Sequence, residues 1–204
     1  MPSVDRTFVL NPELAQFVPD AVFMPYASVD LASLDPMPPQ TTGPITIVHA
    51  PTDPTIKGSR YIIAAVERLK QRHQINFVLV EGMPHAEAMK AYRSADLVID
   101  QVLAGWYGGL AVEVMAMAKP VACYLRHEDF DVLPEGMCAQ LPLVNITPET
   151  IESAIEAFIT QRESWPEWGR RSREYVLRWH NPETIARAMK RAYEDPQSRF
   201  DLAP

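Results

Sequence analysis

The chain has 204 residues and a formal net charge of −7 at pH 7. This length allows one substantial core, and the acidic charge excludes nucleic acid as the main partner because phosphate backbones repel it. With 47% hydrophobic and 22% charged residues, the composition is typical of a globular protein and excludes a disordered tail.

No segment of the sequence is predicted to cross a membrane. Residues 103–125 carry only Glu113 and Lys119 as charges, but a glutamate in the middle of a span is costly in lipid. The first five residues lack the cationic and apolar regions of a secretory signal. Cys123 and Cys138 form no CxxC pair, so free thiols in a reducing cytoplasm fit best.

The first forty residues differ from the remainder of the chain. Short extended runs are predicted at 7–10 and 21–26, separated by a brief helix over 11–17 that Asn11 caps. Residues 30–44 contain four prolines and little apolar periodicity, which predicts a linker or an exposed wrap. We therefore expect the first forty residues to lie outside the main core.

From residue 45 onward, strands and helices alternate. Apolar runs predict buried strands, and apolar positions at helical spacing predict the helices. The strands are 45–49, 77–80, 96–99, 120–124 and 141–144, the helices are 58–72, 84–94 and 109–118, and an acidic loop covers 126–140. Three more helices follow, over 150–159 with Thr147 as the cap, 165–179 and 182–193. The alternation predicts an α/β fold, a Rossmann-like doubly wound parallel sheet with extra C-terminal helices.

In such a sheet a ligand binds beyond the carboxyl ends of the strands, where the strand order reverses. The loop after the strand over 45–49 lacks both GxGxxG and GxxxxGK(S/T), which disfavours classical dinucleotide and P-loop chemistry. It does place Lys57 and Gly58 at the start of a helix, where a cation beside free amides attracts phosphate. The alternative is that Lys57 serves solubility and Gly58 a turn.

The loop before the helix over 109–118 is more informative. Gly108 and Gly109, followed by Leu110, stand at a helix N-terminus, where paired glycines let a pyrophosphate approach the backbone closely. Glu113 follows in an apolar helix, where a buried carboxylate without a partner would be costly, so we expect it to have a specific role. It accepts hydrogen bonds from ribose hydroxyls or, alternatively, the helix dipole stabilises it at a partly exposed position.

Other polar and aromatic residues are weaker candidates. His85 either touches a ligand or lies at the surface near a helix start, and Asp100 ends a strand in the crevice as a ligand-binding or a structural residue. Trp106 and Tyr107 either pack on a base or cover the core. No metal site is predicted, because the acidic cluster in the loop over 126–140 lacks partners at ligand spacing: His127, Glu128, Asp129 and Asp131.

Together these residues resemble, in order along residues 45–193, the C-terminal half of GT-B glycosyltransferases, in particular the large retaining family 4. Lys57-Gly58 resembles the family's KG, and Tyr92 with residues 95–97 its Y..AD step. GGLAVEVMAMAKPV over 108–121 is similar to its glycine-led helix with an acid and the sequence GKPV. The first forty residues are similar to the end of an N-terminal domain and the crossing between domains.

The resemblance implies that the chain binds a nucleotide-diphosphate sugar, such as a UDP- or GDP-sugar, as substrate, with no metal and no separate cofactor. Lys57 would neutralise the departing diphosphate and Glu113 would hold the ribose, which makes these two the expected catalytic residues of a hexosyltransferase. The full donor-binding set that the resemblance implies is Lys57, Gly58, Gly108, Gly109, Leu110 and Glu113.

The resemblance also divides the chain. Residues 1–43 are expected to be a remnant of the N-terminal domain or an interdomain linker, residues 44–195 a nucleotide-sugar-binding domain, and residues 196–204 a tail. Gly105 stands where the family has the first acid of its E-x7-E pair, and the Arg that often precedes the Lys is missing.

The N-terminal Rossmann-like domain, which carries most of the acceptor site in GT-B enzymes, is also missing. We therefore expect the isolated chain to be inactive or weakly active and to need a separate N-terminal domain or subunit. Two alternatives stay open. One is a non-catalytic nucleotide-binding module, and the other is a protein-docking module that uses the proline-rich edge and the basic terminal helices.

Overall fold

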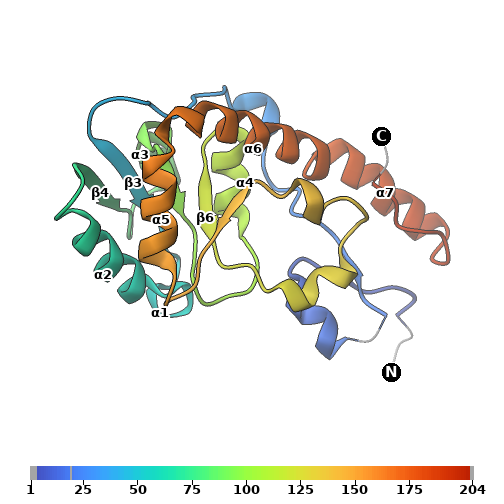
Figure 1. The fold of residues 1–204 in the computed structure, drawn as a ribbon. Helices are drawn as coiled ribbons and strands as arrows, with labels where there is room; N and C mark the ends of the chain where they lie inside the picture. The colour runs from blue at the N-terminus through green and yellow to red at the C-terminus, as the bar shows by residue number, and fades with distance from the viewer. Residues whose placement is uncertain (1–3, 19, 203–204) are drawn as a thin grey trace.

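Five parallel strands form the central sheet of the computed structural model, which describes residues 4–18 and 20–202 (Figure 1). Their order is β4-β3-β5-β6-β7. The strands are β3 (Ile45–His49), β4 (Ile75–Leu79), β5 (Leu97–Ile99), β6 (Val121–Cys123) and β7 (Leu143–Asn145). Every neighbouring pair is parallel, and parallel pairs need crossover connections, which helices usually provide. The predicted α/β fold class is therefore confirmed.

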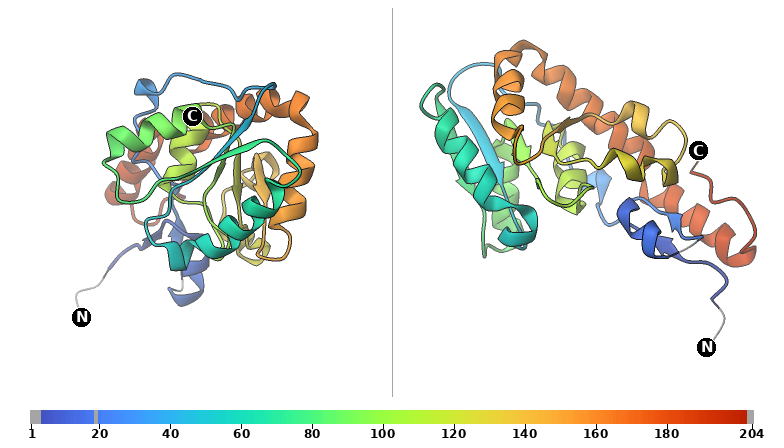
Figure 2. Two further views of the ribbon diagram at one scale, coloured as in Figure 1. Left: turned by 90° about the vertical axis from the view of Figure 1, so that its left-hand side faces the viewer. Right: turned by 60° about the horizontal axis from the view of Figure 1, so that its bottom comes forward.

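Helices cover both faces of this sheet and continue beyond it (Figures 1 and 2). They are α1 (Pro54–Lys57), α2 (Ser59–Leu69), α3 (His85–Ser94), α4 (Gly109–Ala116), α5 (Ile151–Thr160), α6 (Trp165–Trp179) and α7 (Pro182–Glu194). Ile47 belongs to the apolar cluster of α2 and α5, whereas its neighbour Val48 belongs to that of α3, α4 and α6. Both are fully buried, because successive strand residues point to opposite faces and both faces are covered.

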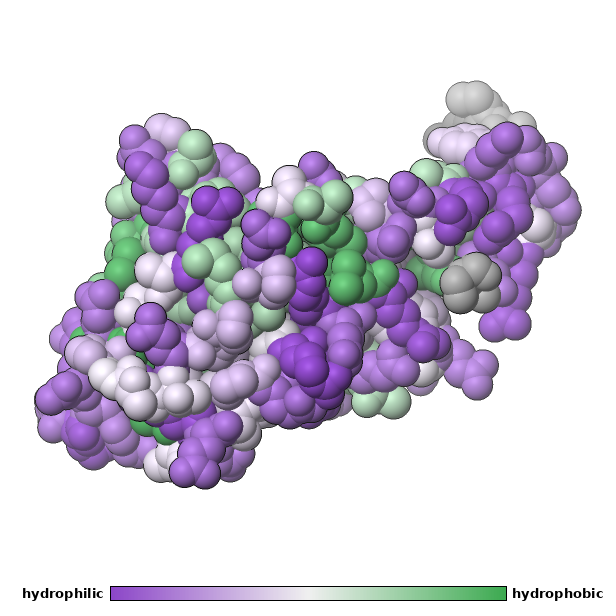
Figure 3. Space-filling model, turned by 90° about the horizontal axis from the view of Figure 1, so that it is seen from above, coloured by the Kyte–Doolittle hydropathy of each residue, from purple (hydrophilic) through white to green (hydrophobic). Residues whose placement is uncertain are grey.

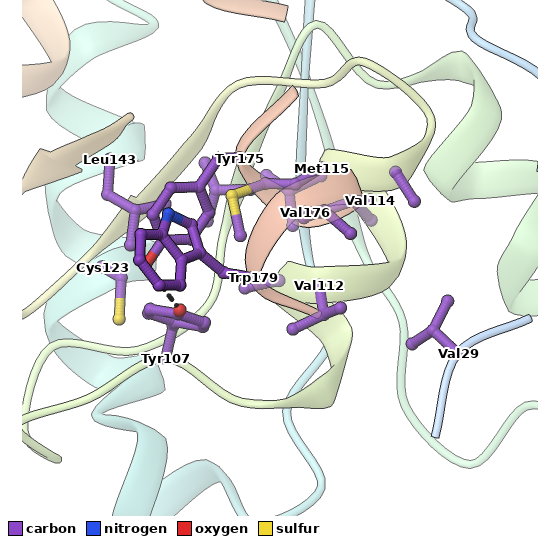
Figure 4. Packing of buried hydrophobic residues seen from close by; sticks show 14 of the residues in the cluster. Val29, Tyr107, Val112, Val114, Met115, Cys123, Leu143, Tyr175, Val176 and Trp179 are labelled. Atoms are coloured by element: carbon purple, nitrogen blue, oxygen red, sulfur yellow. Dashed lines mark hydrogen bonds between the residues drawn. The ribbon is translucent and has the colours of Figure 1, made fainter. Parts of the chain in front are cut away.

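Helix α4 is almost entirely apolar and packs against α6 (Figure 4). Val112 and Met115 of α4 are buried in one cluster with Val176 and Trp179 of α6. Gly169 permits this close approach, because a Cβ at that position would lie 2.1 Å from the carbonyl oxygen of Ala118. The molecule seen from above is mainly hydrophilic, with a small apolar area near the centre (Figure 3).

The N-terminal segment contributes to the core, contrary to the expectation for the first forty residues. Phe23, Val29, Leu31 and Leu34 are buried in the same cluster as α4 and α6. Their sequence spacing has neither the strand nor the helix period, so a local pattern does not reveal their burial. The assignment of residues 1–43 as a remnant of another domain stays a prediction.

Segments from the two ends of the chain lie side by side, at the end of the molecule away from α2 (Figures 1 and 2). The short strands β1 (Phe8–Val9) and β2 (Val22–Phe23) pair in parallel. Arg6 donates a hydrogen bond of 2.6 Å to the carbonyl oxygen of Ser198, and the rings of Phe8 and Phe200 meet edge to face, 5.1 Å apart. Residues 1–3 and the last two residues of the predicted tail over 196–204 lie outside the described residues.

The proline-rich segment over 30–44 is a wrap held by side chains from distant elements. Arg162 donates to the carbonyl oxygens of Thr42 and Gly43, each at 2.8 Å, and Arg173 donates to that of Leu34 at 2.7 Å. Asp96, which is buried just before β5, accepts one amide hydrogen bond from Gln40 inside the wrap and another from Thr46 in β3.

We expect Asp96→Ala to lower the free energy of unfolding by about 2 kcal/mol, because it leaves two backbone amides without their acceptor. The two bonds, from Gln40 and Thr46, are each 2.8 Å long. Asp96→Asn keeps one acceptor oxygen, so its free energy of unfolding should fall by clearly less. Urea unfolding of the two variants and the parent protein measures both effects. Equal losses in the Ala and Asn variants would show that these hydrogen bonds do not hold the wrap.

Several predicted boundaries move, among them the end of the helix expected over 58–72, which lies at Leu69, and the strand expected over 141–144, which is Leu143–Asn145. Two other boundaries move for local reasons. The strand expected over 77–80 begins at Ile75, because residues 75–79 pair along the whole length of β3. The helix expected over 109–118 ends at Ala116, because Ala118 has a left-handed backbone with φ of 60°. The loop over 126–140 also contains two short 3-10 helices, η3 (His127–Val132) and η4 (Cys138–Gln140).

The two predicted caps, Asn11 and Thr147, form no cap hydrogen bond at the start of their helices. Asn181, for which no cap was predicted, caps α7, since its side chain accepts the amides of Glu183 and Thr184. Thr147 instead accepts amides in a turn that precedes α5. Asn11 makes no cap hydrogen bond, because its side-chain oxygen accepts the hydroxyl of Tyr26 at 2.7 Å.

Candidate donor site

The strand order reverses between β3 and β5. After β3 the chain adds β4 on one side, and β5, β6 and β7 follow on the other side. The carboxyl ends of β3 and β5 therefore border the crevice in which doubly wound sheets bind ligands. Lys57 lies in the connection that leaves β3, and Asp100 is the first residue after β5.

Asp100 joins two of the predicted site residues. The Nζ atom of Lys57 lies 2.7 Å from Oδ1 of Asp100, and the amide of Gly108 donates to Oδ2 at 2.7 Å. The Asp100 side chain is fully buried, whereas that of Lys57 is 15% exposed. The fold thus brings Lys57 and Gly108 together, although 51 positions separate them in the sequence (108 − 57).

The amino end of α4 supplies further donors beside this ion pair. Within the described residues, the amides of Gly109 and Leu110 form no hydrogen bond. A Cβ added at Gly109 would meet no atom within 4 Å, so open space lies beside this backbone. Free amides at a helix N-terminus beside a cation are a favourable environment for phosphate.

Lys57 reaches this place differently from the prediction. It is the last residue of α1 and not the first residue of a helix. The unpredicted α1 begins where Asp53 accepts the amides of Thr55 and Ile56 at 2.8 and 3.0 Å. Asp53 directly followed by Pro54 is a helix-start signal that would have revealed α1.

Gly58 has a packing role in the structure. Its backbone is left-handed with φ of 73°, and it links α1 to α2. A Cβ there would lie 2.5 Å from a methyl carbon of Val102 and 2.9 Å from Cγ of Leu103. The glycine therefore lets α1 approach the loop after β5, which helps to place Lys57.

Glu113 is paired with His85 across the two helices α3 and α4. The Nε2 atom of His85 lies 2.8 Å from Oε1 of Glu113. The Glu113 side chain is 18% exposed and that of His85 is 68% exposed. Since one carboxylate oxygen of Glu113 has this partner, the second can still accept a hydroxyl hydrogen bond.

Trp106 and Tyr107 are core residues and do not offer a face for a base, because they are 1% and 0% exposed. The hydroxyl of Tyr107 lies 3.0 Å from the hydroxyl of Tyr175 (Figure 4) and 2.9 Å from Nε2 of His180. Nδ1 of His180 lies 2.9 Å from the carbonyl oxygen of Tyr26. A carbonyl only accepts, so Nδ1 donates, Nε2 accepts from Tyr107, and Tyr107 accepts from Tyr175.

This buried network requires an uncharged imidazole. Burial lowers the pKa of His180 to about 4, and the hydrogen bond to Tyr26 offsets only part of that shift. Burial also raises the pKa of the Tyr107 hydroxyl well above its usual value. The network therefore stays neutral across the physiological pH range. It links Tyr107, just before α4, to Tyr175 in α6 and to Tyr26 in the N-terminal segment.

Gly105 packs closely against Arg126. A Cβ at Gly105 would lie 2.7 Å from Cβ of Arg126, so the position of the missing first acid has no room for a side chain. The Nε atom of Arg126 also lies 3.5 Å from Oδ2 of Asp129.

Within the described residues no group of three or more His, Cys, Asp or Glu side chains could hold a metal ion. No helix in that part of the chain is both long and apolar enough to span a membrane.

An open hollow of about 1040 Å³ lies elsewhere, between the N-terminal segment, the loop after η3, α6 and the C-terminal residues. It includes Phe23, Glu135, Trp179 and Phe200 but no residue from the loops that follow β3 and β5. We place the candidate site at the switch point because the cation and the free amides converge there, and size alone identifies no ligand.

A scan against protein-family models and a search of curated proteins gave no match. Solved structures are similar in fold. Sucrose-phosphate synthase from Thermosynechococcus elongatus is 19% identical with a TM-score of 0.64, over 95% of this chain and 59% of that one. Anabaena HepE in complex with UDP-glucose is 11% identical with a TM-score of 0.65, over 95% and 64%. A mutant of S. aureus TarM, in a complex that contains UDP, is 17% identical with a TM-score of 0.66, over 94% and 44%.

Identities this low show the fold and no more. The described chain has the fold of part of each of these proteins, and it spans 59%, 64% and 44% of their lengths. The predicted Rossmann-like half of a GT-B fold is therefore confirmed. Membership of the retaining family 4 stays a prediction.

Proposed function

We propose that this chain is the donor-binding half of a glycosyltransferase, which binds a nucleotide-diphosphate sugar at the carboxyl edge of its sheet. One observation carries the proposal: Lys57 and the free amides of Gly109 and Leu110 converge at the switch point of the sheet. A cation beside a helix N-terminus suits a diphosphate and would stabilise the charge that develops on it as the sugar leaves.

Each remaining part of the site has a role in this proposal. One carboxylate oxygen of Glu113 is paired with His85, and the other accepts hydrogen bonds from the ribose hydroxyls. Gly108 leaves space beside Lys57, because a Cβ at Gly108 would lie 3.4 Å from the lysine nitrogen. Lys57 and Glu113 are the residues on which transfer depends, and Lys57 with the amides of Gly109 and Leu110 binds the diphosphate.

The proposal includes a partner. The similar structures are longer than this chain, and two of them were determined with UDP-glucose or UDP. We infer that a separate N-terminal domain or subunit supplies the acceptor site and that the chain alone transfers little sugar. A reducing cytoplasm suits the two free thiols, Cys123 and Cys138.

Thermal unfolding with UDP, GDP, ADP and their sugar conjugates tests the donor site. A ligand at one hundred times its Kd should add about 2.7 kcal/mol of stability, which is roughly 5–10 °C in Tm for a domain of this size. We expect one base family to produce this shift and Lys57→Ala and Glu113→Ala each to reduce it strongly.

Matched controls are available in α7. Lys190 and Glu194 form an exposed pair with a nitrogen–oxygen distance of 3.7 Å. Lys190→Ala and Glu194→Ala should keep the full ligand-induced shift. The absence of a shift with every nucleotide would reject the donor site and favour the protein-docking alternative. If Lys57→Ala keeps the full ligand-induced shift in Tm, the phosphate site does not include Lys57.

A further inference from the structure

Asp100 is fixed in the crevice by the sheet itself. It directly follows β5, its amide donates to the carbonyl oxygen of Ala122 at 2.9 Å, and its side chain is fully buried. The pairing of β5 with β6 fixes the backbone of Asp100, and its fully buried side chain is held by two hydrogen bonds.

The two oxygens of Asp100 hold two different elements. Oδ1 lies 2.7 Å from Nζ of Lys57 at the end of α1, and Oδ2 accepts the amide of Gly108 just before α4 at 2.7 Å. A Cβ on Gly108 would lie 3.4 Å from Nζ of Lys57 and 3.6 Å from Oδ2 of Asp100. The ammonium group is thus held against the backbone that leads into α4.

This arrangement leaves donors for a ligand. An ammonium group has three N–H donors, and Asp100 uses one from Lys57. The amides of Gly109 and Leu110 stay free within the described residues. A lysine side chain loses much rotamer entropy when it is fixed, and here the ion pair fixes it before any ligand binds.

The carboxylate also repels an incoming phosphate by its own charge, so two effects oppose each other. The ammonium of Lys57 and the amide of Gly108 already compensate that charge at hydrogen-bond distance. A buried carboxylate that lost this partner would be strongly destabilised. We therefore expect the pair to persist when a ligand binds, and the UDP affinity of Asp100→Asn decides which of the two effects is larger.

We propose that Asp100 is a positioning residue for the diphosphate: it holds Lys57 beside the amino end of α4, so that the cation and the free amides meet the same phosphates. This inference rests on the proposed donor site. It predicts that Asp100 affects ligands with a diphosphate and leaves the binding of the nucleoside unchanged, which a purely structural role would not do.

Affinities of the full chain for UDP and for uridine, measured by calorimetry and NMR titration, test this role. Asp100→Asn has nearly the same shape but accepts only one of the two hydrogen bonds. It should weaken UDP binding about tenfold and leave uridine binding unchanged. Asp96→Asn is the matched control, since Asp96 is also buried and accepts two amides, and it should change neither affinity.

The outcomes separate the two proposals. If the parent chain binds none of UDP, GDP and ADP, the donor site itself is wrong and this role falls with it. If the parent binds UDP but Asp100→Asn binds it equally well or more tightly, or loses uridine to the same degree, only the positioning role is overturned.

Circular dichroism shows whether Asp100→Asn folds. If it does not, NMR of the parent chain replaces the titrations. A rigid Lys57 ammonium group before UDP is added supports the role, and an ammonium group that is mobile until UDP binds overturns it.

Discussion

Gly169→Ala should lower the free energy of unfolding by about 3 kcal/mol, although alanine is the better helix former. The added Cβ would lie 2.1 Å from the carbonyl oxygen of Ala118, 3.1 Å from its carbonyl carbon and 3.3 Å from Cδ of Pro39. The first two of these neighbours are backbone atoms, so rotation of a side chain cannot relieve the contact. Helix α6 must instead move away from α4, which opens the apolar cluster between the two helices.

Urea unfolding at pH 7 measures this effect, and Leu177→Ala is the control. Leu177 lies in the same helix but is 43% exposed, so its truncation should cost less than about 1 kcal/mol. The Gly169 variant should also expose Val176 and Trp179, visible as a changed tryptophan emission spectrum. A Gly169 variant as stable as the parent would mean that α4 and α6 do not approach as described.

Acid should destabilise the protein through His180, by about 3 kcal/mol between pH 7 and pH 4. Burial lowers the pKa of His180 to about 4 in the folded protein, whereas the unfolded chain has the ordinary value near 6.5. In this window the unfolded state binds the proton more strongly. The contribution of His180 to the free energy of unfolding is therefore fully present above the unfolded pKa and is lost as the pH drops towards 4. His49, whose pKa burial also lowers, adds a loss in the same direction.

The contribution of His180 is isolated by difference. Free energies of unfolding at several pH values should fall less steeply with acid in His180→Gln than in the parent. Leu177→Ala is the control, because it changes an exposed side chain that carries no titratable group, and it should leave the slope unchanged. Nitrogen NMR gives an independent readout, a neutral ring protonated at Nδ1 at pH 5.5. A charged His180 at that pH contradicts the network.

The sheet could be predicted because its strands are buried on both faces. Residues 45–49 and 96–99 are mainly apolar runs next to polar or turn residues, so their sequence indicates buried parallel strands. The N-terminal segment could not be predicted in this way. Phe23, Leu31 and Leu34 are buried by α4 and α6, and those partners lie far along the chain.

The site was predicted as separate pieces. Lys57 and Gly108 were each predicted from a local signal, a cation near a helix and a glycine at a helix start. Their connection through Asp100 depends on the adjacency of β3 and β5, which a linear pattern does not contain. The available signal was modest: an acidic residue immediately after a buried strand, at the edge where ligands bind.

The contact of Arg6 with Ser198 also has a consequence during synthesis. Ribosomes add about 5–20 residues per second, so roughly 10–40 s separate the emergence of these two partners. Throughout that delay Phe8 lacks the ring of Phe200, and β1 and β2 can pair only with each other. The contacts that hold the N-terminal segment against residues 198–200 therefore form only after most of this sequence has been synthesised.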